Sequence, residues 1–424
     1  MAKIKPFRAF FYNPEKIKDL SKVVCPPYDV IDANQQDFYH NLSSYNMIHL
    51  ILGKDIPGED KYLRAQSYFK NWIEEKILIS DNSECIYFYL QEYKIKGEKK
   101  IRLGFISLLG LDEENRIFSH EHTRIEPKED RMRLLEALKA NLSPIFVLFQ
   151  DKQRIILRLY EQYINQKDPF IELTDQEGVI HKLWRIDEPY LLEHIQKSMK
   201  DKEIFIADGH HRYEVALSYR NYLREKEHIN KNEERSYDYI MAYFTNIESR
   251  GLLILPVHRL IKKVELTDEI LIAKLRDYFD LEEIKEMHNL LFYLQKAGLR
   301  QPTLGLYKRG RFFILRLKNI TILDKIIKDK PTQYRRLDVC ILNYIILKEI
   351  LNIEPEDKER VIFNQDAEKL IKQADTEEKS LVFLLNPIKV EDMITIASLG
   401  YRLPPKSTYF YPKVISGLVI NKHG

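Results

Sequence analysis

The chain has 424 residues, of which 44% are apolar, and its net charge is +3 because 67 Lys and Arg oppose 64 Asp and Glu. This length predicts two or three lobes, and the apolar share is sufficient for a sizeable core. The near balance of charge disfavours a nucleic-acid-binding protein, which needs a basic surface.

Membrane and secreted proteins are also disfavoured by the sequence. No apolar run approaches the ~20 residues of a membrane span, and the first residues lack the unbroken apolar block of a signal peptide. The three cysteines lie far apart and form no metal-type pair or disulfide framework. We therefore expect a cytoplasmic protein with no membrane partner.

Strand and helix patterns interleave along the whole chain, which predicts an α+β fold with a mixed sheet and surrounding helices. In chain order, strands are expected at 4–12, 85–95, 101–111, 145–149, 204–207, 239–244, 252–257, 303–318 (a hairpin turning at Gly310) and 381–385. Helices are expected at 60–76, 127–141, from 210 onward, 267–279, 337–351 and 390–399. Boundaries near 150 and 265 would separate an N-terminal lobe (1–150), a core (151–265) and a C-terminal lobe (266–424).

The most informative segment is Ile206–Tyr213, in which a short apolar strand is followed by Asp208, Gly209, two histidines and Arg212 at the start of a helix. Backbone N–H groups at a helix start bind anions, above all phosphate. Glycine allows close approach to the backbone, and arginine can grip two phosphate oxygens. The alternative is a structural one, in which Asp208 caps the helix and the other polar residues face solvent.

A second cluster contains Glu121 between two histidines, followed by Lys128, Asp130 and Arg131. A carboxylate beside basic residues suits a general base or a metal ligand. The alternative is a charged loop that enters a charged helix.

Three weaker clusters complete the candidates. A stiff Pro-Pro segment presents Tyr28 and Asp29, and His258 and Arg259 end an apolar strand. The segment Pro404–Lys413 offers lysines and hydroxyls for a phosphate or a carboxylate, but it lacks the glycines of a P-loop, so a Walker motif is excluded. A structural turn explains the Pro-Pro segment equally well, and a strand end facing water explains His258 and Arg259. For Pro404–Lys413 the equal alternative is an aromatic-rich closing segment that packs on the core.

Taken together, these motifs resemble an uncharacterised prokaryotic family known only as a domain of unknown function. The resemblance spans about Lys5 to Val419 and implies no established activity. It rests on P-P-Y-D-V (Pro26–Val30), H-E-x-T (His120–Thr123) with D-R (Asp130-Arg131), N-x-S-P-I-F (Asn141–Phe146), A-D-G-H-H-R-Y (Ala207–Tyr213), L-P-x-H-R (Leu255–Arg259) and P-K-S-T-Y-F-Y-P-K (Pro405–Lys413).

The Asp208–Arg212 box alone is similar to the strand–turn–helix phosphate box of the ParB/sulfiredoxin superfamily. Sulfiredoxins have a cysteine where this chain has His210, which disfavours sulfinic-acid reduction. Partition proteins carry Glu-Arg-Arg after the glycine, and this chain has His210–Arg212. The Asp-Gly-His box of the free-serine kinases matches best. This resemblance implies phosphoryl transfer from ATP or ADP, with Mg²⁺, to the hydroxyl of L-serine or a similar small metabolite.

Roles follow from residue type and from this resemblance. We assign the nucleotide phosphates to Gly209, His210, His211 and Arg212, with Arg131 and Lys406 as further contacts. Asp208 is the candidate for Mg²⁺ or for the hydroxyl proton, and Glu121 is the alternative base. Substrate contacts are assigned to Tyr28, Asp29, His258, Arg259, Ser407 and Thr408.

Two rival functions stay open at this point. The first is a phosphatase or metal-dependent hydrolase that uses His210 or His211 as nucleophile or metal ligand. The second is a nucleotide-binding protein without catalysis. The sequence defines neither the acceptor nor the oligomeric state.

Overall fold

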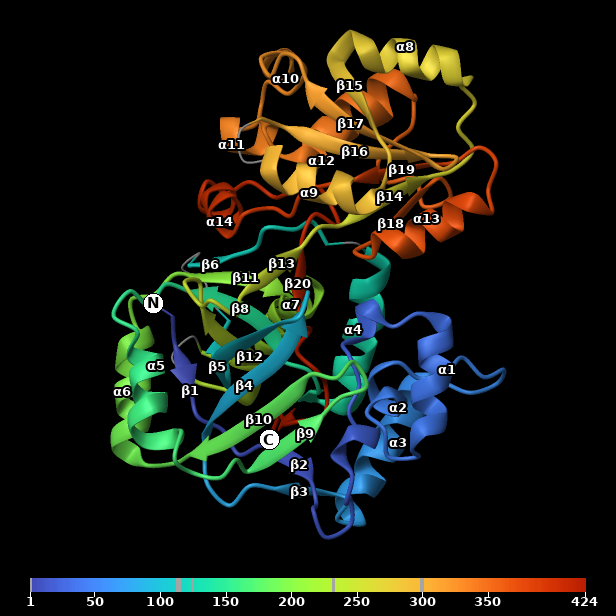
Figure 1. The fold of residues 1–424 in the computed structure, drawn as a ribbon. Coiled ribbons are helices and arrows are strands. Elements are labelled where there is room, and N and C mark those ends of the chain that lie inside the picture. The colour runs from blue at the N-terminus through green and yellow to red at the C-terminus, as the bar shows by residue number, and fades with distance from the viewer. Residues whose placement is uncertain (1, 112–115, 124, 231–232, 298–300) are drawn as a thin grey trace. The chain divides into compact units, whose positions relative to one another are not determined.

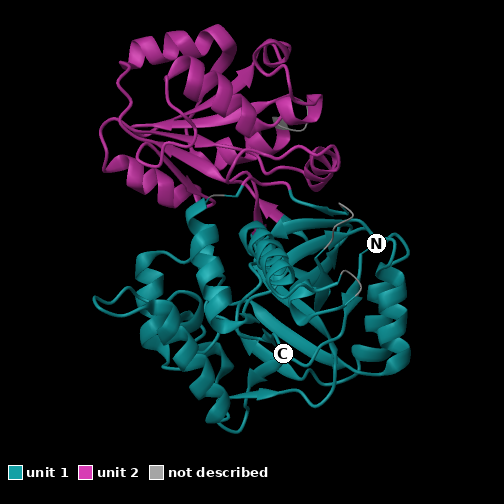
Figure 2. Cartoon of the chain, turned by 180° about the vertical axis from the view of Figure 1, so that it is seen from behind, with its two compact units in different colours: residues 1–119, 123–253, 412–424 teal, residues 120–122, 254–411 magenta. Residues whose placement is uncertain are grey.

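A computed structural model describes residues 2–111, 116–123, 125–230, 233–297 and 301–424, and its contacts divide the chain into two compact units. Unit 1 contains residues 1–119, 123–253 and 412–424, and unit 2 contains residues 120–122 and 254–411 (Figure 2). The chain passes between the units at 119–120, at 122–123, within β13 (Leu253–Leu255) and at 411–412. The lobe boundaries near residues 150 and 265 stay a prediction. Within the described residues, no helix is both long and apolar enough to cross a membrane.

Unit 1 is built around a mixed sheet (Figure 1). Its strands are β1 (Ile4–Lys5), β4 (Ile86–Ile95), β5 (Glu98–Gly110), β6 (Ile117–Phe118), β8 (Ile145–Phe149), β9 (Ile171–Thr174), β10 (Ile180–Ile186), β11 (Ile204–Asp208) and β12 (Tyr239–Asn246). Over the described residues their order is β6-β11-β8-β12-β5-β4-β10-β9, with β1 paired to β5. β6 is parallel to β11 and β8 to β12, and the other pairs are antiparallel.

The hairpin of β4 and β5 shows how the sequence dictates this sheet. Its turn residues, Lys96 and Gly97, both have positive φ, as a tight hairpin turn requires. Aromatic and β-branched residues fill the strands, and Phe105 stacks on Phe244 of β12 with ring centroids 4.8 Å apart. Because large apolar side chains prefer the buried, pleated surface, these strands form the core of unit 1.

Helices cover the sheet of unit 1. They are α1 (Ala33–Leu42), α2 (Ile48–Ile51), α3 (Lys61–Glu74), α4 (Ile125–Leu138), α5 (Ile155–Leu159), α6 (Pro189–Met199) and α7 (His210–Lys226). α4 packs on α3 and α7, while α5 packs on α6. Two short strand pairs complete the unit, β2 (Phe10–Tyr12) with β3 (Leu78–Ser80), and β7 (Ala140–Asn141) with β21 (Asn421–Lys422).

Unit 2 has an antiparallel sheet of its own. Its strands are β14 (His258–Ile261), β15 (Phe279–Ile284), β16 (Thr303–Lys308), β17 (Arg311–Leu317), β18 (Val361–Asn364) and β19 (Leu381–Leu384), and β20 (Tyr409–Tyr411) lies outside the sheet. In the described residues their order is β15-β17-β16-β19-β14-β18. The helices are α8 (Asp268–Tyr278), α9 (Met287–Ala297), α10 (Ile322–Ile326), α11 (Thr332–Arg335), α12 (Asp338–Ile341), α13 (Ala367–Asp375) and α14 (Val390–Ser398).

The mixed α+β architecture is thus confirmed. Thr267 caps α8 by accepting a hydrogen bond from the Ile270 backbone N–H, and the β16–β17 hairpin turns at Gly310 with φ of 80°. The helix expected at 337–351 begins as α12 and continues as a π-helix over Leu342–Ile350, in which the apolar side chains Leu342, Ile345, Ile346, Leu347 and Ile350 are buried. The relation to the ParB/sulfiredoxin superfamily stays a prediction.

Candidate functional site

The segment 206–213 forms a strand, a tight turn and a helix, as its sequence predicts. β11 ends at Asp208, Gly209 takes a left-handed conformation with φ of 90°, and α7 begins at the next residue. A Cβ atom at Gly209 would lie 2.9 Å from both Ile145 Cγ2 and Arg212 Nη2, so only glycine fits. In the described structure no side chain caps α7 at this glycine. The helix start therefore presents positive partial charge that attracts anions.

Asp208 lies between two cations inside unit 1. Its Oδ1 accepts a hydrogen bond from Lys413 Nζ at 2.6 Å, and its Oδ2 accepts one from Arg212 Nη2 at 3.1 Å. None of the three side chains is more than 14% exposed. Burial alone would raise the pKa of Asp208, but Lys413 and Arg212 hold it well below its usual range. Asp208 is therefore ionised at neutral pH and is a weak base there.

Arg212 is fixed by contacts within the protein. Its Nη1 donates to the carbonyl oxygen of Pro144 at 2.6 Å, and its Nη2 is engaged by Asp208. To bind a phosphate as predicted, Arg212 would have to share its N–H groups between the phosphate and these acceptors, or break these hydrogen bonds. Beside it, His210 is buried and His211 is partly exposed.

A cavity of about 60 Å³ adjoins this box, and its walls come from separated parts of unit 1. Tyr28 and Arg131 meet there, with the guanidinium carbon 4.0 Å from the ring centroid. Burial raises the pKa of Tyr28 to about 12, and the charges of Arg212 and Asp208 also act on its hydroxyl. Asp29 follows on the exposed side of the same turn. The lining includes Tyr28, Arg131, Asn141, Ser143 and Arg212.

Within unit 1 the fold thus brings together several motifs that are far apart in the sequence. Tyr28 of the Pro-Pro segment, residues 140–143 before β8 and Arg212 of the Asp208 box line one cavity, and Lys413 of the C-terminal segment reaches Asp208 of the same box. The site residues assigned from the sequence omit Lys413. The signal for it in the sequence is its place in the Pro405–Lys413 motif, which holds Lys413 as well as Lys406.

The remaining candidates belong to unit 2. Glu121 Oε1 accepts a hydrogen bond from the Lys406 backbone N–H at 3.1 Å, and Thr408 Oγ1 lies 3.1 Å from His120 Nε2. Ser407 donates its hydroxyl hydrogen bond to a backbone carbonyl oxygen, that of Pro404. Glu121, Lys406 and Thr408 therefore hold the 404–408 segment against residues 120 and 121, whereas Ser407 bonds within the segment.

His258 and Arg259 begin β14 and are both buried. His258 Nδ1 accepts a hydrogen bond from the Leu385 backbone N–H at 3.1 Å, which requires the neutral imidazole. Burial, assisted by the neighbouring Arg259, lowers the pKa of His258 to about 4. Burial also lowers the pKa of Arg259, to about 9.

A Mg²⁺ ion on Asp208 would compete with the hydrogen bonds that this carboxylate already accepts. Both carboxylate oxygens already accept hydrogen bonds from cations, so a metal there would have to displace Lys413 or Arg212. No group of three or more His, Cys, Asp or Glu suited to a metal occurs in the described part of the chain. The residues present do not fit a Mg²⁺ ion held on Asp208, and the metal role of Asp208 stays a prediction.

A protein-family model now places the chain. The model of DUF1015, described as a protein of unknown function, matches residues 4–340. The chain belongs to the DUF1015 family. This confirms the family resemblance that the sequence motifs indicated, and the matched range includes the Asp208 box but ends before Lys413.

Solved structures give this DUF1015 protein distant neighbours. A free serine kinase in complex with AMP is 13% identical, covering 75% of this chain and 91% of its own, with a TM-score of 0.36. A conserved hypothetical protein from Pyrococcus furiosus is also 13% identical, with shares of 74% and 95% and a TM-score of 0.35. SbnI with a C-terminal truncation, from Staphylococcus aureus, is 10% identical, with shares of 73% and 85% and a TM-score of 0.36. No curated protein sequence matches the chain. At these TM-scores the likenesses do not define an activity.

Proposed function

We propose that this DUF1015 protein binds ATP or ADP at the start of α7 and transfers the terminal phosphoryl group to the hydroxyl of a small metabolite, with L-serine as the first candidate. The observation that carries the proposal is the glycine-led start of α7 beside the buried Asp208, Arg212 and Lys413 cluster. Helix N–H groups and nearby cations are the features that bind and polarise phosphate.

In the proposed reaction the acceptor oxygen forms a bond to the terminal phosphorus while the bond from that phosphorus to the bridging oxygen breaks. ATP then leaves as ADP, or ADP leaves as AMP, and the hydroxyl proton passes to a base. Gly209 and the two histidines that follow it would contact the phosphates. Glu121 is the base we propose, because the low pKa of Asp208 makes that carboxylate unsuitable.

Several roles are carried forward as parts of this proposal. Lys406 and Arg131 would contact phosphate, and Mg²⁺ would arrive with the nucleotide phosphates, as it often does in phosphoryl-transfer sites. Substrate contacts are proposed for Tyr28, Asp29, His258, Arg259, Ser407 and Thr408.

The test is binding of MgATP and MgADP, measured by thermal shift and titration calorimetry. A ligand at about 100 times its dissociation constant adds about 2.7 kcal/mol of stability, which a shift assay detects readily. The variant His211→Gln alters a partly exposed residue at the start of α7, and we expect roughly tenfold weaker binding, equivalent to about 1.4 kcal/mol. The matched control is Lys197→Gln in α6, an exposed lysine paired only with Glu193.

Turnover separates the proposal from its rivals. Phosphorylation of L-serine or a related hydroxylated metabolite, lost in Glu121→Gln while nucleotide binding persists, supports the transferase. Nucleotide binding without any turnover would favour the non-catalytic protein. Release of phosphate from small phosphoesters in the absence of nucleotide would favour the hydrolase that uses the histidine pair. No binding of either nucleotide to the wild type would refute the proposal.

A further inference from the structure

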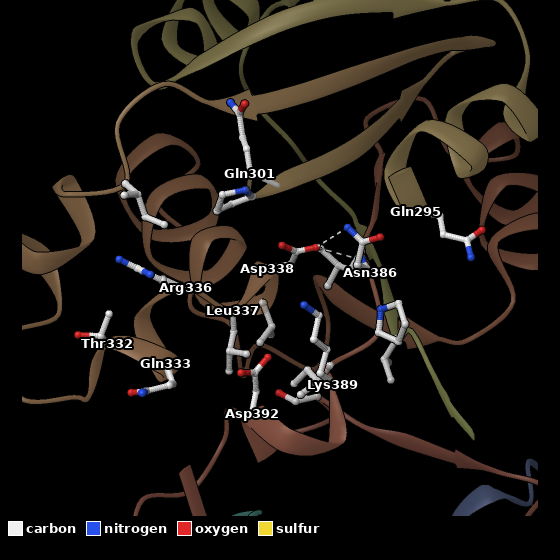
Figure 3. A pocket seen from close by; sticks show the side chains of 18 of the residues that line it. Gln295, Gln301, Thr332, Gln333, Arg336, Leu337, Asp338, Asn386, Lys389 and Asp392 are labelled. Carbon is white, nitrogen blue, oxygen red and sulfur yellow. Dashed lines mark hydrogen bonds between the residues drawn. The ribbon is translucent and has the colours of Figure 1, made fainter. Parts of the chain in front are cut away.

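Unit 2 contains a pocket of about 550 Å³ that is lined by its own residues. The pocket lies where β19 ends and where its antiparallel neighbours β14 and β16 begin, so it is at one end of the three central strands of the sheet. The starts of α12 and α14 add further walls. The volume is within the range of small-molecule sites. Figure 3 shows the polar side chains around it, among them Gln301, Arg336, Asp338, Asn386 and Lys389.

One wall carries a buried cation without a carboxylate partner. Arg259 is 1% exposed and lines the pocket. Its guanidinium donates to the backbone carbonyl oxygens of Val257 and Lys406 and lies 4.6 Å from the ring centroid of Phe363. Its buried Nε has no hydrogen-bond partner, and no acidic side chain of the described residues forms an ion pair with it. A buried charge left uncompensated in this way is costly, and an anion would compensate it.

The same pocket carries an uncompensated carboxylate. Asp338 Oδ2 accepts hydrogen bonds from the backbone N–H and the side-chain amide of Asn386, at 3.1 and 2.9 Å. Figure 3 shows the other oxygen turned away from Asn386. No cation of the described residues pairs with Asp338, and burial raises its pKa to about 6. A ligand ammonium group would compensate this carboxylate in the way that a salt-bridge partner does.

A buried cation and a partly buried carboxylate therefore line one cavity without neutralising each other. Their natural complement is a ligand that carries both charges. Lys389 and Arg336 add exposed cations to the pocket lining, and Asp392 adds a partly exposed carboxylate. With Arg259 and Asp338 the lining holds three cations and two carboxylates, which favours a net negative or neutral ligand over a net positive one. The amide side chains of Gln295, Gln301 and Gln333 supply hydrogen bonds for a polar remainder.

We propose that the unit 2 pocket binds a small zwitterion of the α-amino-acid type, with its carboxylate held by Arg259 and its ammonium group held by Asp338. This site shares no residue with the phosphate box of unit 1, but it shares Arg259 and Ser407 with the substrate contacts proposed above. The proposal itself does not depend on phosphoryl transfer, because each half of it rests on the lining of a pocket within unit 2.

The test uses the full chain without nucleotide. L-Serine, L-glutamine, L-glutamate and L-arginine are titrated by calorimetry, and the best ligand is compared with its analogues that lack either the ammonium or the carboxylate group. We expect millimolar or tighter binding of at least one amino acid, and at least tenfold weaker binding of both of its analogues.

Two variants separate the charges. Arg259→Met keeps the length of the side chain and removes its charge, and we expect at least a tenfold rise in Kd. Asp338→Asn should weaken the amino acid at least tenfold while leaving the analogue without the ammonium group unchanged. Glu359→Gln is the matched control, because Glu359 is exposed and pairs only with Lys263. If Arg259→Met does not fold, the selective effect of Asp338→Asn decides the question.

Three results would overturn the inference. The first is that none of the four amino acids binds. The second is that the wild type binds the analogue without the ammonium group as tightly as the amino acid itself. Unchanged affinity in Asp338→Asn would remove the assigned ammonium contact. Nucleotide binding in unit 1 is measured separately, so failure here and failure of the proposed function are distinguishable.

Discussion

The buried cluster of Asp208, Arg212 and Lys413 makes a quantitative prediction about stability. Each oxygen of Asp208 accepts one charge-assisted hydrogen bond, and all three side chains are at most 14% exposed. Removing either end of a buried ion pair leaves a charge in the interior that has lost its partner. We therefore compare Asp208→Asn, Lys413→Met and the double variant.

The expected loss of unfolding free energy in each variant depends on which buried charges are left without a partner. Lys413→Met leaves Asp208 with Arg212 as a partner, so the loss is that of one charge-assisted hydrogen bond, about 1.5–3 kcal/mol. Asp208→Asn leaves two cations facing each other, and we expect about 3–5 kcal/mol. The double variant removes one charge of each sign, so it should cost less than the sum of the two single variants by at least about 1.5 kcal/mol.

The assay uses a convenient property of the sequence. Both tryptophans of the chain, Trp72 and Trp184, belong to unit 1, so their fluorescence in urea reports the unfolding of that unit. Lys197→Met is the control, and as an exposed helix pair it should change stability by no more than about 0.5 kcal/mol. Additive single-variant effects, with a coupling below about 0.5 kcal/mol, would refute the buried-cluster reasoning.

Three further predictions concern single positions. Gly209→Ala should destabilise unit 1 by about 1–3 kcal/mol, since the new Cβ meets Ile145 in a left-handed backbone, and tryptophan fluorescence in urea measures this. Relative to His258→Gln, the wild type should lose about 3 kcal/mol of stability between pH 7 and pH 4, because His258 must stay neutral to accept from Leu385 and its pKa falls from 6.5 to about 4 on folding; calorimetry of both proteins measures this difference, from which the opposite contribution of Asp338 cancels. Asp338→Asn should stabilise the unliganded protein at pH 7 by about 1–3 kcal/mol, because folding raises the carboxyl pKa from 3.8 to about 6 and this cost disappears in the variant; unchanged calorimetric stability would contradict it.

The sequence predicted helices, strands and turns well where a residue type is needed for a particular backbone conformation. Gly209 and Gly310 both mark positions of positive φ, and Thr267 marks a helix start. The strand–turn–helix of the phosphate box followed for the same reason, because a short apolar run, a glycine and an amphipathic repeat are each local features.

The sequence could not predict features that depend on contacts between residues far apart along the chain. Lys413 lies 205 positions from Asp208 along the chain, and only the fold brings the two together. The unit 2 pocket was missed for a related reason, since Asp338 opens an apolar helix and resembles an ordinary solvent-facing first-turn acid. Its burial beside Asn386 is a property of how β19 and α12 pack, which no spacing rule expresses.

The C-terminal segment provides the strongest test of how far unit 1 depends on contacts between distant parts of the chain. Residues 412–424 return to unit 1, where Lys413 completes the cluster on Asp208, and the carbonyl oxygens of Pro412 and Lys413 accept hydrogen bonds from the buried Arg102 and Gln91. The segment also buries five apolar side chains, each at most 4% exposed, namely Val414, Ile415, Leu418, Val419 and Ile420.

Burial of such side chains is worth about 1.5–3 kcal/mol each, so the segment contributes roughly 10 kcal/mol, comparable to the whole stability of a domain. A chain ending at Tyr411 should therefore lack the cooperative urea transition of unit 1 in tryptophan fluorescence, although it retains the whole of the family match at residues 4–340. Removal of Gly424 alone is the control and should leave the transition intact. A truncated chain that still unfolds cooperatively, with native tryptophan emission before the transition, would mean that unit 1 is stable without this segment and that Asp208 does not need Lys413.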